Sequence, residues 1–401
     1  MPTLTHQILW GSGLVGEWCA ISPVQIASGN WYVFLMSVGN GGNQDFFYRK
    51  STNQGLTWGA PVYILTGVDT TRTAVWYDRW TTGDSGNLIH IVALDSTNHN
   101  VTYWNLDTSS DTLTSPLVVV DGASFSTVVT NSTWVTITKT RGGNVIIVYD
   151  GDGGTEDGAR KAASPYTSFS TIADPSEGND WFMAFPGNYA DNQDADLLYW
   201  DVSFNELSLK VYDDSVDSWS EASISGGFNT VIDAATVFPQ FTGAVRHSDG
   251  HLLVAAFTDY DTATADLKTW DINGTGSITA KTDILTDKDD TGGVALLIDQ
   301  STDDVFVFHL GKGDGSEAIG SSVGIYYNKS SDDMVTWASE ATLFATILNN
   351  YKRIGCNLSQ SGQSYLPVAW YEDTNSLQKF WATAYIADAG AAGGHIIGGG
   401  M

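Results

Sequence analysis

Residues 87–107 read NLIHIVALDSTNHNVTYWNLD, two runs of β-branched, aliphatic and aromatic residues joined by a short turn-forming segment. Runs of this kind form neighbouring strands of an antiparallel sheet. The first run recurs every 52 to 60 residues along the chain, starting at Asn30, Asn87, Asn144, Asp196, His251, Asp304 and Ser364. Such a period predicts a repeat architecture in which each repeat is one supersecondary unit.

Each repeat supplies four strand candidates. An apolar segment precedes the first run, as in TAVWYD at Thr73–Asp78, and an aromatic-rich run follows it. A shorter run follows in six of the seven repeats, as in PLVVV at Pro116–Val120. We therefore predict an all-β fold, a seven-bladed β-propeller of four-stranded antiparallel blades, because radial packing buries both faces of each sheet. A six-bladed propeller is the alternative, and it requires one repeat to be discarded.

The two ends of the sequence indicate how the ring closes. The seventh repeat has no fourth run, whereas HQILW at His6–Trp10 has no repeat of its own. We expect residues 5–10 to pair with residues 377–385 and to hide a sheet edge. Residues 1–388 then form one domain, and the Gly/Ala-rich residues 389–401 form a flexible tail. Cys19 and Cys356 fall on inner strands of neighbouring blades, either as two small buried residues or as a disulfide.

The charge of the chain excludes several classes of partner. There are 18 Lys and Arg residues against 46 Asp and Glu, which gives a net charge of -28. Because nucleic-acid affinity rests on basic groups that displace counterions, we expect no nucleic-acid partner. No apolar run approaches the roughly 20 residues of a membrane span, and the amino terminus lacks the pattern of a signal peptide. We therefore expect neither membrane insertion nor signal-directed secretion.

Two segments carry a recognisable turn motif, STNQGLTW at Ser51–Trp58 and SSDDMVTW at Ser330–Trp337. They resemble the Asp-box, or bacterial neuraminidase repeat, of sialidase-like propellers, whose pattern is Ser, any, Asp, any, Gly, any, Thr, Trp. The resemblance implies a sialidase-like propeller over nearly the whole chain, with the six-bladed form as the alternative. It also implies structural roles for the matching positions, which are Ser51, Asn53, Gly55, Trp58, Ser330, Asp332 and Trp337.

The catalytic residues that this resemblance implies are incompletely matched. Sialidases use three arginines on the sugar carboxylate, a Tyr nucleophile with a Glu partner and an Asp acid/base, and this chain has only seven arginines without an Arg-Ile-Pro motif. Related polysaccharide lyases show an Asp-His-Asn run on the first inner strand, where this chain has EWCAISPVQ. The remaining carboxylate candidates for catalysis are Glu17, Asp78 and Asp233.

Other candidate groups are expected at the mouth of the central funnel, together with Asp78. Aromatic residues stack on sugar rings, while carboxylates and Arg bond hydroxyl groups. The candidates for ligand binding are Trp18, Arg72, Trp76, Tyr77, His99, Trp181 and Arg353. Core packing, ion pairing and turn formation are the alternative roles. Asp150 and Asp152, in the loop DGDGGTEDG, are a weak Ca²⁺ candidate against a solvated turn, and no other cofactor is expected.

These observations favour a non-catalytic glycan-binding or structural propeller. The strong acidity, the absent signal peptide and the Gly/Ala tail are similar to accessory virion proteins of tailed viruses, which are released by lysis. The expected partners are glycans or other virion proteins, with oligomers formed through assembly. A polysaccharide-degrading hydrolase or lyase is the first alternative, and an intracellular interaction scaffold is the second.

Overall fold

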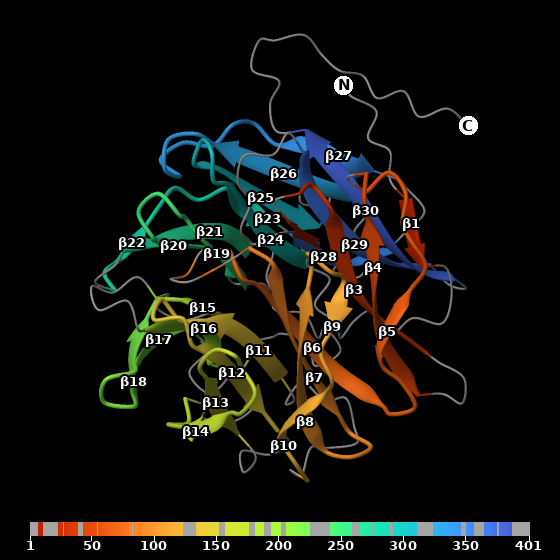
Figure 1. The fold of residues 1–401 in the computed structure, drawn as a ribbon. Coiled ribbons are helices and arrows are strands. Elements are labelled where there is room, and N and C mark those ends of the chain that lie inside the picture. Colours follow the sequence, from red (N-terminus) through yellow and green to blue (C-terminus); the bar gives the residue numbers. More distant parts are fainter. Residues whose placement is uncertain are drawn as a thin grey trace.

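The chain folds into antiparallel sheets without a described helix. The computed structural model describes residues 7–10, 23–26, 28–38, 43–53, 55–79, 81, 84, 86–122, 134–151, 157–175, 181–187, 194–201, 206–224, 241–258, 265–273, 276–288, 292–310, 324–345, 350–356, 365–374 and 377–386. Hydrogen bonds join the strands in these ranges into seven sheets. Figure 1 shows the sheets arranged around a common centre in the order of the sequence.

The first four sheets follow one another along the chain. The first comprises β2 (Val24–Gln25), β3 (Trp31–Val38), β4 (Gln44–Ser51) and β5 (Val62–Leu65). The second comprises β6 (Thr70–Tyr77), β7 (Leu88–Asp95), β8 (Asn100–Asp107) and β10 (Leu117–Val120), with β9 (Thr112–Leu113) beside β8. The third comprises β11 (Trp134–Lys139), β12 (Val145–Asp150), β13 (Gly158–Ala162) and β14 (Ser170–Ile172). The fourth comprises β15 (Trp181–Pro186), β16 (Ala195–Asp201), β17 (Glu206–Asp213) and β18 (Ser218–Ser223).

The last three sheets complete the ring. The fifth comprises β19 (Phe241–Val245), β20 (Leu252–Thr258), β21 (Ala265–Ile272) and β22 (Ile278–Ala280), with β23 (Leu285–Lys288) also paired to β21. The sixth comprises β24 (Gly292–Asp299), β25 (Asp304–Leu310), β26 (Gly324–Ser330) and β27 (Ala341–Ala345). The seventh comprises β28 (Asn350–Cys356), β29 (Tyr365–Thr374), β30 (Leu377–Ile386) and β1 (Gln7–Trp10).

The pairing of β1 with β30 agrees with the expected closure. Gln7 lies opposite Ala382, and Ile8 lies opposite Trp381. The first described strand of the chain therefore provides the outer strand of the last sheet, and β30 gains a hydrogen-bonded neighbour.

Every sheet is four strands wide, as expected, but in two sheets the outer position is divided. In the second sheet β9 pairs with β8 beside β10, and in the fifth sheet β23 pairs with β21 beside β22. In both sheets the outer edge is divided between two short strands, because the chain turns and returns to the same partner. The sequence signal missed this arrangement, since strands of two to four residues leave almost no alternating pattern.

The core lies between neighbouring sheets. The strands next to the inner edge are buried on both faces, as in β12, whose six residues are all buried, whereas five of the six residues of β18 are exposed. One apolar cluster spans the third to fifth sheets, and another joins the second sheet to the third. Burial of β-branched and aromatic side chains from both faces of each sheet explains why the central runs read as continuously apolar.

Candidate functional site

The inner strands of the second, third and fourth sheets are β6, β11 and β15, and they lie side by side. All three run in the same direction along the central channel of the ring. Near their first residues, the Arg72 guanidinium lies over the Trp134 ring at 5.5 Å, and Trp134 Nε1 donates a hydrogen bond to the Phe182 carbonyl at 2.6 Å. Near their last residues, Lys139 contacts Asp78. We call the first end of the channel the mouth and the second end the base.

Two of the predicted ligand-binding residues lie at the mouth but are buried. Arg72 has 2 % of its surface exposed and bonds the Thr71 carbonyl at 3.0 Å, and Trp181 is also 2 % exposed and packs against Trp200. His99 lies in the turn between β7 and β8 with a left-handed φ of 58°. A buried indole offers no face for stacking on a sugar, so the described part of the mouth lacks the aromatic platform that Trp181 was expected to provide.

The placement of Asp78, Tyr77 and Trp76 at the mouth is wrong. Trp76 and Tyr77 are the last two residues of β6 and Asp78 follows them, six to eight positions after the first residue of the strand at the mouth, so all three lie at the base. Tyr77 is buried and its hydroxyl donates to the Gly86 carbonyl at 2.7 Å, and Trp76 is buried in the core between the second and third sheets. Because a strand of eight residues spans roughly 27 Å, residues at its two ends cannot face one ligand.

Asp78 belongs to a buried polar cluster at the base. Lys139 Nζ donates to Asp78 Oδ1 at 2.7 Å and also to Asp84, while His90 Nε2 lies 3.6 Å from Asp78 Oδ2. His90 Nδ1 lies 2.7 Å from the Tyr103 hydroxyl. The side chains of Asp78, Asp84 and Lys139 are at most 4 % exposed, so the cluster joins the second and third sheets away from solvent.

The pKa values in this cluster follow from burial and from the shared ammonium. Burial opposes ionisation of Asp78, but hydrogen bonds with His90 and Lys139 hold the pKa of Asp78 below its usual range. Burial and the neighbouring Asp78 raise the pKa of Asp84 to about 7. Burial lowers the pKa of His90, which keeps the imidazole neutral. The Lys139 ammonium thus keeps Asp78 ionised, whereas Asp84 is only partly ionised near neutral pH. Such an arrangement is typical of a structural ion cluster.

Several predicted site residues lie outside the described residues. These are Glu17, Trp18, Asp233, Asp152 and Cys19. Arg353 and Cys356 have a described backbone in β28, but their side chains lie outside the description. Asp150 is described and fully buried at the end of β12. Within the described ranges no group of three or more His, Cys, Asp or Glu residues has the arrangement of a metal site.

The two Asp-box segments form matching turns at the base side of their sheets. In the first, Ser51 Oγ accepts from the Gly55 amide at 2.8 Å, and Asn53 Oδ1 accepts from the Thr57 amide at 2.9 Å. In the second, Ser330 Oγ and Asp332 Oδ1 accept from the Met334 and Thr336 amides at 3.0 and 2.9 Å. The short side chains therefore satisfy backbone donors inside the turn, as the motif predicts.

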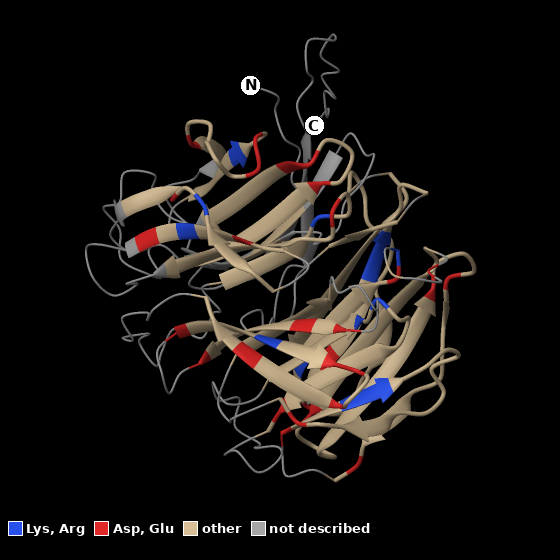
Figure 2. Ribbon diagram, turned by 90° about the vertical axis from the view of Figure 1, so that its left-hand side faces the viewer, with Lys and Arg blue, Asp and Glu red and all other residues tan. Residues whose placement is uncertain are grey.

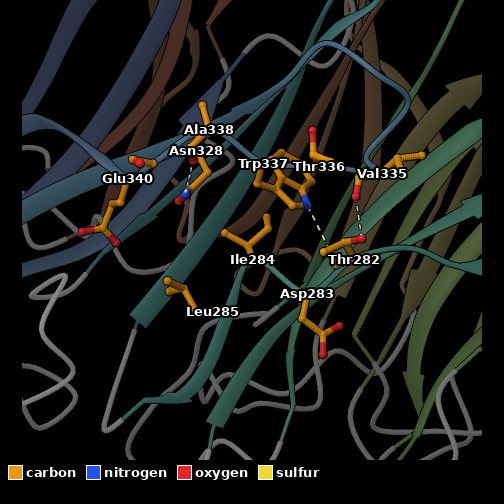
Figure 3. A pocket seen from close by; sticks show the side chains of 11 residues that line it. Thr282, Asp283, Ile284, Leu285, Asn328, Val335, Thr336, Trp337, Ala338 and Glu340 are labelled. Carbon is orange, nitrogen blue, oxygen red and sulfur yellow. Dashed lines mark hydrogen bonds between the residues drawn. The ribbon is translucent and has the colours of Figure 1, made fainter.

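A pocket of about 440 Å³ adjoins the second of these turns. It lies between the fifth and sixth sheets and is lined by Thr282, Asp283, Ile284, Leu285, Asn328, Val335, Thr336, Trp337, Ala338, Ser339 and Glu340. Figure 3 shows the Trp337 ring above Ile284, with Asp283 on one side and Asn328 and Glu340 on the other. Trp337 Nε1 donates to the Thr282 carbonyl at 2.9 Å, so the indole joins the two sheets and also forms part of the pocket wall.

Ion pairs hold the turn against the fifth sheet. Asp333, beside Asp332 in the second Asp-box turn, accepts from Arg246 Nη1 and from Lys281 Nζ, both at 2.5 Å. Thr282 Oγ1 donates to the Val335 carbonyl at 2.7 Å. These contacts tie both walls of the pocket together, so the pocket is positioned before any ligand arrives.

The polar atoms of the pocket are mainly hydrogen-bond acceptors. Asn328 Nδ2 donates to the Ala338 carbonyl at 3.1 Å, whereas Asn328 Oδ1 is buried and has no hydrogen-bond partner within the described part of the chain. Glu340 Oε2 lies 3.3 Å from Nε2 of the buried His309. Burial raises the pKa of Asp283. A ligand that donates several hydrogen bonds and presents an apolar face would complement this surface.

Sequence reasoning did not find this pocket. Its two walls come from residues 282–285 and 328–340, which belong to neighbouring sheets. The motif indicated only the structural role of Trp337. No sequence pattern marks the pocket, because the pairing of the walls depends on how two sheets pack.

Comparisons with known proteins define the fold class. No family model matches the chain, and no curated protein matches its sequence. The structure is similar to that of the NanB sialidase of Streptococcus pneumoniae, with a TM-score of 0.50 and 12 % identity over 94 % of this chain and 70 % of that one. It is similar at the same TM-score to hydrazine synthase of Kuenenia stuttgartiensis, with 9 % identity over 89 % and 93 % of the two chains.

The chain is therefore a β-propeller of the sialidase-like fold class. Two proteins with such different names show that the fold leaves the activity open. The described residues include no helix long and apolar enough to cross a membrane.

The comparison corrects the predicted blade number for this class. The sialidase neighbours have six blades, so a seven-bladed sialidase-like propeller is contradicted, and the six-bladed alternative is the form that these neighbours support. The strand pairing of this chain differs from that form, because its hydrogen bonds define seven separate sheets. The Asp-box is a turn within one sheet, so it carries no information about the number of sheets in a ring.

Proposed function

We propose that the chain is a non-catalytic glycan-binding propeller and that the pocket between the fifth and sixth sheets holds the sugar. The observation that carries this proposal is the partly exposed Trp337 indole beside the unpartnered Asn328 Oδ1. A sugar ring has an apolar face that stacks on an indole and hydroxyl groups that donate to carboxamide and carboxylate oxygens. Asp283 and Glu340 supply further acceptors in the same pocket.

The charge of the pocket favours a neutral sugar over an acidic one. Asp283 and Glu340 both line it, and none of the described residues that line it is Lys or Arg. An anionic sugar would bring a third negative group to these two carboxyl groups, and its charge would find no cationic partner there. We therefore propose a neutral saccharide as the ligand class.

Hydrolysis of a polysaccharide is the second candidate function, and one observation favours it. Asp283, whose pKa is raised by burial, shares the pocket with Glu340, and glycosidases pair a protonated acid with a carboxylate. Against this, Glu340 lies beside the buried imidazole of His309, Trp337 is held by a hydrogen bond to the fifth sheet, and Asn328 is held by one within the sixth. These contacts favour a rigid binding surface, so we place binding first.

We extend the proposal to display of this propeller on a virion of a tailed virus. The net charge of -28 supports the extension, because a strongly negative surface resists adsorption to nucleic acid during assembly. Immunogold labelling of purified particles tests it, and particles without label would refute the virion location while leaving glycan binding intact.

The test of glycan binding compares two tryptophans in similar bonding positions. Trp337 Nε1 donates to the Thr282 carbonyl, and Trp219 Nε1 donates to the Ala173 carbonyl, both at 2.9 Å. A neutral glycan array followed by calorimetry with the best ligand should show binding by the wild type and by Trp219→Phe. Trp337→Phe and Asp283→Asn should each weaken it about tenfold, which is roughly 1.4 kcal/mol.

The outcomes separate the two candidate functions. Equal weakening in Trp219→Phe and Trp337→Phe would contradict the pocket as the binding site. Release of reducing ends from a polysaccharide panel, abolished by Asp283→Asn or Glu340→Gln in a folded protein, would contradict the non-catalytic assignment and establish the hydrolase.

A further inference from the structure

Three basic side chains occupy equivalent positions at the base of the central channel. Arg79, Arg141 and His247 are each the second residue after an inner strand, β6, β11 and β19 respectively. Because these strands lie around the same channel and end at its base, the three residues come to one place from three different sheets. This clustering is notable in a chain with only 18 Lys and Arg residues.

Hydrogen bonds to neighbouring sheets fix two of the three positions. Arg141 Nε donates to the Gly187 carbonyl of the fourth sheet at 2.8 Å. The His247 amide donates to Gln300 Oε1 of the sixth sheet at 2.7 Å, and Gln300 Nε2 donates back to the Val245 carbonyl at 2.8 Å. Burial, followed by the charges of Arg79 and Arg141, lowers the pKa of His247 to about 3. Both arginines therefore act on this imidazole from other sheets.

Arg79 is the member whose guanidinium is left unsatisfied. Its Nη1 is buried and has no hydrogen-bond partner among the described residues. The carboxylate next to it in sequence, Asp78, is engaged by Lys139 and His90. A buried guanidinium nitrogen without an acceptor is unfavourable, and a planar guanidinium binds oxyanions with two parallel hydrogen bonds.

Acidic residues near Arg141 do not replace an anion. Asp196 acts on Arg141 through its charge, but burial and the neighbouring Asp194 raise the pKa of Asp196 to about 8. Asp196 is therefore largely protonated at neutral pH and supplies little negative charge. Both guanidinium groups stay positively charged at neutral pH.

We propose that Arg79, Arg141 and His247 form a binding site for a compact oxyanion, namely a phosphate, sulfate or carboxylate group. Arg79 provides the unpartnered donor, Arg141 adds a second guanidinium from the next sheet, and the neutral imidazole of His247 donates one hydrogen bond. The site lies in the channel and shares no residue with the sugar pocket, so a test of either site leaves the other untested.

Titration with simple anions tests this site. Sodium sulfate, phosphate and acetate are compared at pH 7 with sodium chloride of equal ionic strength, by calorimetry and by the unfolding midpoint. At least one oxyanion should bind saturably and raise the midpoint. Arg79→Gln should weaken that binding at least tenfold, whereas Arg49→Gln, which removes one positive charge from β4, should leave it unchanged. The most effective anion identifies the chemistry of the group.

Two results would overturn the proposal. One is the lack of saturable binding by all three oxyanions in the wild type, and the other is equal weakening in both arginine variants. A wild-type measurement covers the case in which Arg79→Gln does not fold. The imidazole NMR signals of His247 should show a raised pKa when the effective anion is bound, and an unchanged pKa would count against direct contact.

Discussion

Gly55 shows how one residue adapts the Asp-box turn to its neighbour. Its φ is +82°, and a Cβ there would lie 2.7 Å from Cζ3 of the buried Trp31. Met334 holds the matching position of the second turn with a φ of 60°, and its side chain is buried in the core between the fifth and sixth sheets. The same backbone thus accepts a side chain wherever the neighbouring sheet leaves space for it.

Replacement of Gly55 by Ala should therefore destabilise the protein by roughly 2–4 kcal/mol, from backbone strain together with overpacking against Trp31. Gly29→Ala is the control, because Gly29 has a φ of +85° but no atom within 4 Å of its Cβ position. Chemical denaturation should give a loss of only about 1 kcal/mol for that control. Equal losses would show that Trp31 imposes no restriction at Gly55.

Asp196 predicts a pH dependence of stability. Its folded pKa of about 8 lies above the usual value of 3.8, because burial and Asp194 disfavour the anion. The stability that it contributes is fully present below pH 4 and is lost as the pH rises through about 8. Between pH 6 and 9, the wild type should lose more stability than Asp196→Asn in urea denaturation. Parallel curves for the two proteins over this range would contradict the raised pKa.

At the scale of strands and sheets, the sequence predicted elements better than it predicted sites. The apolar runs located the central strands, because burial on both faces leaves continuous apolar stretches such as LIHIVAL in β7. The pairing of β1 with β30 was predicted because the seventh repeat lacks a fourth strand and the amino-terminal strand has no repeat of its own. Short strands such as β9, and the pocket built from two sheets, left no such pattern.

The position of Asp78 was mispredicted because the sequence places a residue on a strand without showing which end of the channel it reaches. Arg72 and Asp78 are only six positions apart, yet they stand at opposite ends of β6. The sequence also did not show whether a side chain is buried. A tryptophan such as Trp181 can equally pack in the core or stack on a sugar.

Removal of residues 1–10 should expose the edge of β30, because these residues include its hydrogen-bonded neighbour β1. We expect a lower melting temperature and concentration-dependent aggregation. Removal of residues 389–401 is the control, since it takes away no described strand. Calorimetry and light scattering measure both effects, and an amino-terminal truncation that behaves like the control would contradict the role of β1 in closure.

At the scale of the whole molecule, the acidic residues occur mainly at strand ends and turns, and Lys and Arg are fewer, as Figure 2 shows. A net charge of -28 makes the folded surface repel itself more strongly than an extended chain does. Asp is favoured in turns, so a fold with many hairpins gains many Asp residues, and these contribute to its negative charge.

Salt should therefore stabilise the protein. Raising NaCl from about 0.02 M to 0.3 M shortens the screening length from roughly 20 Å to 6 Å, which weakens repulsion between sheets more than it weakens close ion pairs such as Arg246 with Asp333. The melting temperature in calorimetry should rise by several degrees. A fall with added salt would show that ion pairs outweigh the surface repulsion.

The pairing of β1 with β30 also sets a time order for folding. At a synthesis rate of about 5–20 residues per second, β1 leaves the ribosome roughly 20–80 s before its partner. During that interval hairpins such as β7–β8 can form, since their contacts are local, but the ring stays open with β1 unpaired. The last step of folding is thus a closure between the two most distant parts of the described chain, and we infer that any chaperone requirement falls on that waiting period.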